Sequence, residues 1–132
     1  MKRLLPFVAL LMMVSACDVY VVEPRYDARD RILGQYDVEE YSETYNDLSY
    51  YTMYITKSGS SEIYIDNFYA SDIRVYAYLD YDEITIPYQV VNGYEIEGAG
   101  TSHGSSLSLS YRVTDTYDDS YTDFCETTAR RY

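Results

Sequence analysis

From Ile32 onward the chain alternates apolar and polar residues in short runs, a pattern typical of half-buried β-strands. The clearest run covers residues 73–80, where every second side chain is apolar and one face of a strand would be buried; the inward residues are Ile73, Val75, Ala77 and Leu79. Residues 107–114 repeat the pattern, with inward Leu107, Leu109, Tyr111 and Val113. This alternation, with a period of two residues, predicts an all-β fold for the domain.

Weaker alternation predicts six further strands, so that about eight strands follow one another at close spacing. These six cover residues 35–43, 50–57, 62–68, 83–88, 94–98 and 121–129. The connections are short and rich in Gly, Ser, Asn and Asp, and short connections join antiparallel neighbours. No stretch carries a useful helical stripe of apolar residues. We therefore expect an antiparallel up-and-down meander that closes into a small barrel, with a two-sheet β-sandwich as the alternative.

The first residues differ from this domain and predict a lipoprotein signal peptide over residues 1–16. Lys2 and Arg3 precede an apolar run that is shorter than the roughly 20 residues of a membrane-spanning helix. Val14-Ser15-Ala16-Cys17 then resembles the bacterial lipobox, which implies cleavage before Cys17 and acylation of that cysteine with palmitate-like chains. Residues 17–31 would follow as a flexible tether, and residues 32–132 as the barrel domain.

The net charge of the chain argues against a nucleic-acid partner, and its two cysteines have different predicted roles. The chain has a formal net charge of −12, and loss of Lys2 and Arg3 would make it more acidic still, so we expect no nucleic-acid partner. The membrane would be contacted through the acyl chains on Cys17. Lipidation leaves Cys125 without a second thiol in the chain, and we expect it to be a buried small residue.

The sequence is similar to the small lipocalin-like, or calycin-like, lipoproteins of Gram-negative bacteria, whose members largely lack an assigned function. The resemblance covers about residues 30–128 and lies in the lipobox and in three strand segments: 32–38, 55–59 and 84–87. It implies a lipocalin-like barrel in the cell envelope. Larger lipocalins that carry a ligand have larger side loops and a C-terminal helix, and this sequence has neither.

Candidate reacting groups are few, and we predict that the protein is not an enzyme and needs no cofactor. The single histidine, His103, lies in a Gly- and Ser-rich turn where we expect it to be solvated. Glu95 and Glu97 would share the outer face of a strand, with Ile96 pointing inward. A weak calcium site in the acidic segment 115–123 stays open, although its spacing matches no known calcium loop, and the sequence holds no Cys/His cluster for zinc.

Tyrosine is unusually frequent, with 19 residues and no tryptophan, and it suits both strands and binding surfaces. Hairpin pairing predicts a ladder on the outer wall, with Tyr54 opposite Tyr64 and Tyr64 opposite Tyr76. Tyr78 would lie diagonally to this ladder, and Asp66 would face Arg74. These four tyrosines, Tyr54, Tyr64, Tyr76 and Tyr78, are the predicted binding residues.

The sequence is compatible with two functions. The first is a noncatalytic binding or adhesion module that presents its acidic, Tyr-rich outer face to an envelope protein or glycan. The second is a carrier of a small apolar ligand inside the barrel, which large inward side chains such as Tyr36, Tyr94 and Tyr111 disfavour. Asp18 resembles the inner-membrane retention signal of enteric bacteria, but that rule is not general, and we expect the outer membrane or the periplasmic face.

Overall fold

Eight strands and one short 3-10 helix make up the part of the chain that the structure describes. The structure is a computed structural model, and it describes residues 26–132 except for the side chains of Asp119 and Ser120. In chain order the elements are η1 (Ala28–Arg31), β1 (Gly34–Ser42), β2 (Asp47–Ser58), β3 (Glu62–Phe68), β4 (Ile73–Asp80), β5 (Glu83–Val91), β6 (Tyr94–His103), β7 (Ser106–Asp115) and β8 (Asp118–Arg131). The predicted signal peptide and Cys17 lie outside the described residues.

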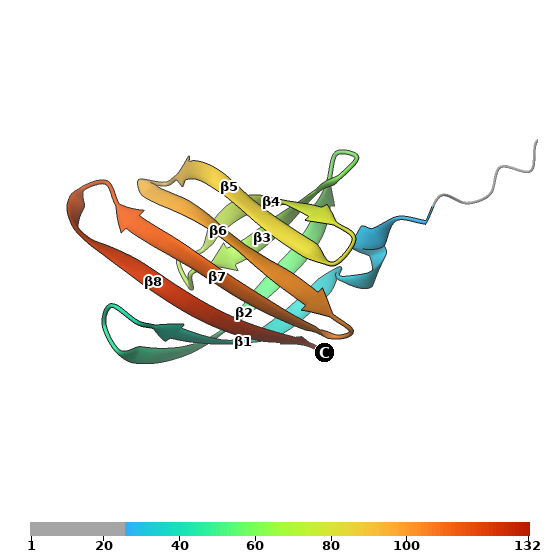
Figure 1. The fold of residues 1–132 in the computed structure, drawn as a ribbon, viewed down its shortest axis with the longest axis horizontal. Coiled ribbons are helices and arrows are strands. Elements are labelled where there is room, and N and C mark those ends of the chain that lie inside the picture. The colour runs from blue at the N-terminus through green and yellow to red at the C-terminus, as the bar shows by residue number, and fades with distance from the viewer. Residues whose placement is uncertain (1–25) are drawn as a thin grey trace, which may run out of the picture.

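Each strand pairs with the next one along the chain in antiparallel fashion, and β8 pairs with β1 to close a barrel (Figure 1). The closing ladder runs from Tyr36 opposite Arg131 to Ser42 opposite Cys125. Closure removes the unpaired strand edges that a sandwich would keep. The predicted up-and-down barrel is therefore confirmed, and the two-sheet alternative is wrong.

The two clearest alternating runs place their side chains as predicted. In β4, Ile73, Val75 and Ala77 are at most 4% exposed, while Arg74 and Tyr78 are exposed on the outer wall. In β7 the inward side chains of residues 107, 109, 111 and 113 are all buried. Together with the isoleucines of the other strands they form one continuous core inside the barrel.

A bulge in β5 shows how the barrel tolerates a proline within a strand. The β5–β6 register shifts between Ile86 and Gln89, on either side of Pro87, which has no backbone N–H to give to a ladder. The Gln89 side chain replaces the missing pairing with β4, because its Oε1 accepts from Tyr76 N at 3.1 Å and its Nε2 donates to Tyr76 O at 2.9 Å. The strand stays attached without a regular ladder.

The end of the predicted flexible tether belongs to the domain instead. Arg29 of η1 is 7% exposed, and its Nη1 donates to the backbone carbonyls of Ser58, Gly59 and Glu62 at 2.9–3.0 Å. Asp27 caps η1 and pairs with the Arg29 guanidinium at 2.8 Å. Hydrogen bonds from Arg29 hold the pKa of Asp27 well below its usual value. Residues 27–31 therefore form an ordered turn, because Asp27 and the three carbonyl groups that the buried Arg29 guanidinium contacts hold it against the barrel.

Candidate functional site

The two ends of the barrel are distinct because the meander places alternate turns at opposite ends (Figure 1). One end, which we call the closed end, carries η1, the C-terminus and the turns at 59–61, 81–82 and 104–105. The other end, which we call the mouth, carries the turns at 43–46, 69–72, 92–93 and 116–117. The chain enters the barrel at the closed end.

Buried polar side chains are distributed unequally between these ends. Arg29 is the buried polar residue of the closed end, whereas the others lie at the middle of the barrel or toward the mouth: Glu40, Ser42, Gln89, Thr114, Asp123 and Thr127. Glu40 and Asp123 are only 5% and 4% exposed. A carboxylate taken out of water is costly unless hydrogen bonds or a counter-charge replace its hydration.

Hydroxyl groups supply the hydrogen bonds to both buried carboxylates. Glu40 Oε2 accepts from Tyr51 at 2.6 Å, from Thr127 at 3.2 Å and from the Tyr111 hydroxyl. Asp123 accepts from the Tyr69 hydroxyl at 2.5 Å and from Ser42 Oγ. Within residues 26–132, neither carboxylate takes part in an ion pair. The interior near the mouth therefore has an excess of negative charge held by neutral donors.

The groups around these carboxylates keep their protons at neutral pH. Burial, reinforced by Glu40, raises the pKa of Tyr51 and Tyr111, and burial together with Asp123 raises that of Tyr69. Burial also raises the pKa of the free thiol of Cys125, with Glu40 and Asp123 adding to the effect. A thiol that stays protonated is a poor nucleophile. The prediction that Cys125 is buried is confirmed, since it is 1% exposed.

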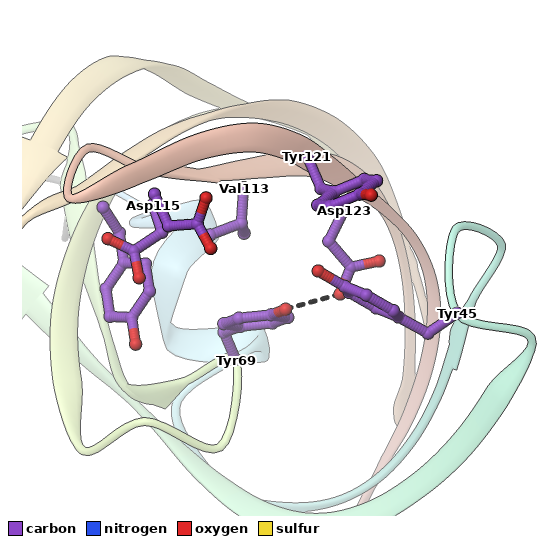
Figure 2. Close-up of a pocket in the computed structure, with 8 residues that line it drawn as sticks. Tyr45, Tyr69, Val113, Asp115, Tyr121 and Asp123 are labelled. Carbon is purple, nitrogen blue, oxygen red and sulfur yellow. Dashed lines mark hydrogen bonds between the residues drawn. The ribbon is translucent and has the colours of Figure 1, made fainter.

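A cavity of about 210 Å³ opens above Asp123 at the mouth (Figure 2). Its walls come from four separate parts of the chain: the β1–β2 turn, the β3–β4 turn, the start of β6 and the β7–β8 hairpin. The lining residues are Tyr45, Tyr69, Tyr94, Val113, Asp115, Asp118, Tyr121 and Asp123. Every charged side chain in this lining is acidic, and four of the eight residues are tyrosines.

The β3–β4 turn fixes Tyr69, which links the cavity to the interior. Asn67, Tyr69, Ala70 and Asp72 all have φ between 50° and 60°, a conformation that costs free energy in residues other than glycine. Asn67 holds the turn by donating to Thr52 O at 2.7 Å and accepting from Asp72 N at 3.0 Å. The Tyr69 ring meets Tyr94 edge to face, with centroids 6.1 Å apart, and Tyr111 in the same way at 6.4 Å. Tyr69 is therefore fixed on three sides.

The predicted outer tyrosine ladder is correct in β3 and β4 and wrong in β2. Tyr64 pairs with Tyr76 and Asp66 with Arg74, as predicted, and the Arg74–Asp66 ion pair measures 2.6 Å. Tyr54, however, faces Asp66, because Ser58 pairs with Glu62 and the turn holds residues 59–61. That turn shifts the β2 register by two residues from the predicted one.

The four outer tyrosines, which we call the outer patch, lie on the neighbouring strands β2, β3 and β4. Tyr54 and Tyr78 are 45% and 41% exposed, while Tyr64 and Tyr76 are half-buried. The Arg74 guanidinium lies over the Tyr64 ring, 4.6 Å from its centroid, and Tyr76 meets Tyr78 edge to face at 6.0 Å. Part of the surface of these rings is therefore covered by contacts with neighbouring side chains of the same sheet.

The remaining sequence candidates do not converge on one site. Ile96 is fully buried, so Glu95 and Glu97 lie on the outer wall as predicted, where Tyr88 and Arg112 donate to them at 3.1 and 2.6 Å. His103 is exposed at the closed end, far from the buried carboxylates in the fold. In the part of the chain that the structure describes, no group of three His, Cys, Asp or Glu side chains is arranged to hold a metal ion.

The sequence singled out the acidic segment 115–123 of the mouth only as an open calcium candidate and did not point to the other parts of this cavity. Tyr45, Tyr69 and Tyr121 were not predicted as site residues, nor were the carboxylates of Glu40 and Asp123 as buried groups. One signal was present: both acids occupy inward positions of alternating strands, Glu40 two residues beyond Val38 and Asp123 two residues before Cys125. A charged residue on an inward face indicates a special environment.

No protein-family model matches the chain, and no curated protein matches it either. Among solved structures, a redesigned beta barrel is similar, with a TM-score of 0.58 and 11% sequence identity over 83% of this chain and 99% of that one. At this identity the likeness supports the barrel fold alone. Within residues 26–132, no helix has the length and apolar character needed to span a bilayer.

Proposed function

We propose that this protein is a noncatalytic, lipocalin-like binding module, held in the bacterial cell envelope by acyl chains on Cys17, with the mouth of the barrel as its binding site. The observation that carries the proposal is the concave, acidic, tyrosine-lined cavity at that end. Mouths of β-barrels are common ligand sites. The segment that leads back to Cys17 joins the opposite, closed end, so an anchor there would leave the mouth facing away from the membrane.

The placement of reactive groups supports a noncatalytic role. General-base catalysis needs a base within hydrogen-bond reach of its target. His103 lies at the closed end, whereas Cys125 is buried toward the mouth as a protonated thiol. The histidine and the free thiol therefore lie toward opposite ends of the barrel and do not form a base–nucleophile pair.

A ligand buried deep in the barrel, as in the carrier function, finds less support. Tyr36 and Phe68 are at most 1% exposed inside the barrel, and Phe68 packs against Tyr111 with ring centroids 4.4 Å apart. These rings and the surrounding isoleucines occupy the space that an apolar ligand would need. Binding at the mouth requires no rearrangement of this core.

The anchor is tested on the full-length protein in a Gram-negative host. Feeding an alkyne analogue of palmitate should label the protein, and mass spectrometry of its N-terminal peptide should show acylated Cys17 as the first residue. A Cys17→Ser variant should take up no label. Label that persists in this variant, or an intact N-terminus on the wild type, would contradict the anchor.

The binding site is tested by blocking it. Asp118 is exposed at the rim of the mouth, and Asp118→Trp would place a large ring over the cavity without disturbing the core. Asp82→Trp is the matched control, because Asp82 is exposed at the closed end. After incubation with a cell-envelope extract, native mass spectrometry should find a small molecule on the wild type and on the control variant but not on Asp118→Trp.

The outer patch is the second candidate surface, because Tyr54 and Tyr78 keep more than 40% of their area exposed. A double variant, Tyr76→Thr and Tyr78→Thr, keeps the β-propensity of β4 and removes its outer rings. If this variant loses an envelope protein or glycan partner while Asp118→Trp keeps it, the binding surface is the wall and the proposal for the mouth is wrong.

A further inference from the structure

We propose that the mouth cavity binds a small organic cation, an ammonium compound whose charge lies among Asp115, Asp118 and Asp123 with tyrosine rings around it. This inference rests on the proposed function, since it names the class of ligand that the mouth would take. It follows from three features of the cavity: its charge, its aromatic walls and its size.

The described lining of the cavity carries negative charge and no positive side chain to neutralise it. Asp123 is 4% exposed and borders the cavity, and within the part of the chain that the structure describes its hydrogen bonds come from the neutral hydroxyls of Ser42 and Tyr69. Asp115 and Asp118 add two further carboxylates to the lining, and among the described residues no Lys, Arg or His belongs to it. A cation that enters would supply the counter-charge that the fold does not, whereas an anion would be repelled.

The walls of the cavity suit an organic cation better than a bare metal ion. Tyr45, Tyr69, Tyr94 and Tyr121 come from four different segments of the chain, and Figure 2 shows Tyr45, Tyr69 and Tyr121 around the Asp123 carboxylate. The face of an aromatic ring attracts an ammonium group, and rings combined with carboxylates are a known way to bind quaternary ammonium ions. Hard metal ions instead prefer a shell of oxygen ligands.

The size of the cavity limits the ligand. Its volume of about 210 Å³ is below the roughly 300–1,000 Å³ of pockets that hold drug-sized molecules. Val113 in its lining is also part of the packed core that fills the barrel. The ligand is therefore a small ammonium compound that fits within the mouth rather than a chain that threads the barrel.

The first experiment separates charge from shape. Choline and its uncharged carbon isostere 3,3-dimethylbutan-1-ol have nearly the same shape, and each is titrated by calorimetry into the mature lipoprotein in a maltoside detergent, which carries no ammonium group of its own. We expect saturable choline binding and at least roughly tenfold weaker binding of the alcohol, since cation–π and carboxylate contacts both need the charge.

The outcomes distinguish this inference from the proposed function. Equal binding of choline and the alcohol, blocked by Asp118→Trp, would leave the mouth as a binding site and overturn the cationic ligand. No saturable binding of choline would overturn the cationic ligand as well, while the envelope-extract experiment decides independently whether the mouth binds anything.

Matched variants locate the interaction. Tyr121→Ser should weaken choline binding by about two- to fivefold, the range of one exposed cation–π contact. Asp118→Asn should weaken it too, and more strongly at low ionic strength, because salt screens an exposed charge. The controls Tyr50→Ser and Asp82→Asn make the same changes at exposed sites outside the cavity and should leave the affinity unchanged. Equal losses in the controls would indicate attraction to the acidic surface as a whole and would refute a built site.

Discussion

At the closed end of the barrel the buried charge of Arg29 meets Asp27 and three backbone carbonyls. Toward the mouth, the buried carboxylates of Glu40 and Asp123 meet hydroxyl groups and, within residues 26–132, no positive side chain. The first arrangement is complete within the chain itself and ties η1 to the β2–β3 turn. In the second, the negative charge is held by hydrogen bonds from hydroxyl groups, and Asp123 also borders the cavity. The closed end thus satisfies its buried charge with an ion pair and carbonyl groups, whereas the mouth relies on hydroxyl groups beside a cavity.

The largest expected difference between the two halves is their response to alkaline pH. Cys125, Tyr51, Tyr69 and Tyr111 have raised pKa values in the folded protein, so they keep protons that the unfolded chain loses. Stability should therefore fall with rising pH, first above about pH 8.5 through the thiol and more steeply above about pH 10 through the phenols. Each such group contributes a loss of about 1.4 kcal/mol per pH unit in its window.

Urea unfolding between pH 7 and 11 measures this loss. Cys125→Ala should abolish the loss of stability that occurs below about pH 10, because the phenol groups do not yet titrate there. Tyr36 serves as a comparison in the closed half, where burial also raises the pKa but the hydroxyl donates to Ile32 O at 2.8 Å and not to a carboxylate. A stability that stays constant up to pH 11 would mean that the mouth hydroxyls are not buried as described.

Core packing near the closed end should give the next largest effect. Ile63 is fully buried in β3, close to the turn that Arg29 holds. Ile63→Ala should lower the free energy of unfolding by about 2–5 kcal/mol through lost contacts and a cavity, whereas Ile63→Val should cost about 0.5–1.5 kcal/mol. Choline binding at the mouth should be unchanged as long as the variant is folded. A loss below the range of the valine variant would indicate a loosely packed closed half.

Removal of the central carboxylate should have a smaller effect. Glu40→Ala leaves the hydroxyls of Tyr51, Tyr111 and Thr127 without their shared acceptor and should lower the free energy of unfolding by about 1–3 kcal/mol. Glu40→Gln keeps a carbonyl oxygen and removes the charge, so it should cost less. If the glutamine variant loses as much stability as the alanine variant in chemical denaturation, the carbonyl oxygen alone does not hold the hydroxyls and the charge is required.

The smallest effect on stability is expected at the rim of the mouth. Tyr45 and Tyr121 are 59% and 64% exposed, and replacing either ring with Ser should change the free energy of unfolding by no more than about 0.5 kcal/mol. The same variants should weaken choline binding. Thermal melts of both variants check the first statement, and a drop of several degrees would show that the rim rings stabilise the barrel as much as they serve a ligand.

Local sequence was sufficient to predict most of the strands and the order of their pairing. An alternation with a period of two residues indicates which side chains point inward, and short turns indicate that neighbouring strands are antiparallel. The bounds of β3 and β4 were therefore predicted as the structure gives them, and their mutual register was correct. Register across the β2–β3 turn was not predictable in the same way. Taking two residues of one strand into the turn shifts every partner by two without changing which side chains face inward.

By itself, then, the sequence determined the all-β class, the meander, the inward position of Cys125 and the acidic, tyrosine-rich character of the chain. Only the tertiary structure decided that β8 closes on β1 and that Tyr45, Tyr69, Tyr94 and Tyr121 line one cavity with Asp123. Alternation reports whether a side chain points inward, and carries no information on which distant turns share one end of the barrel. That information arises only when closure brings segments up to 76 residues apart, from Tyr45 to Tyr121, around a common axis.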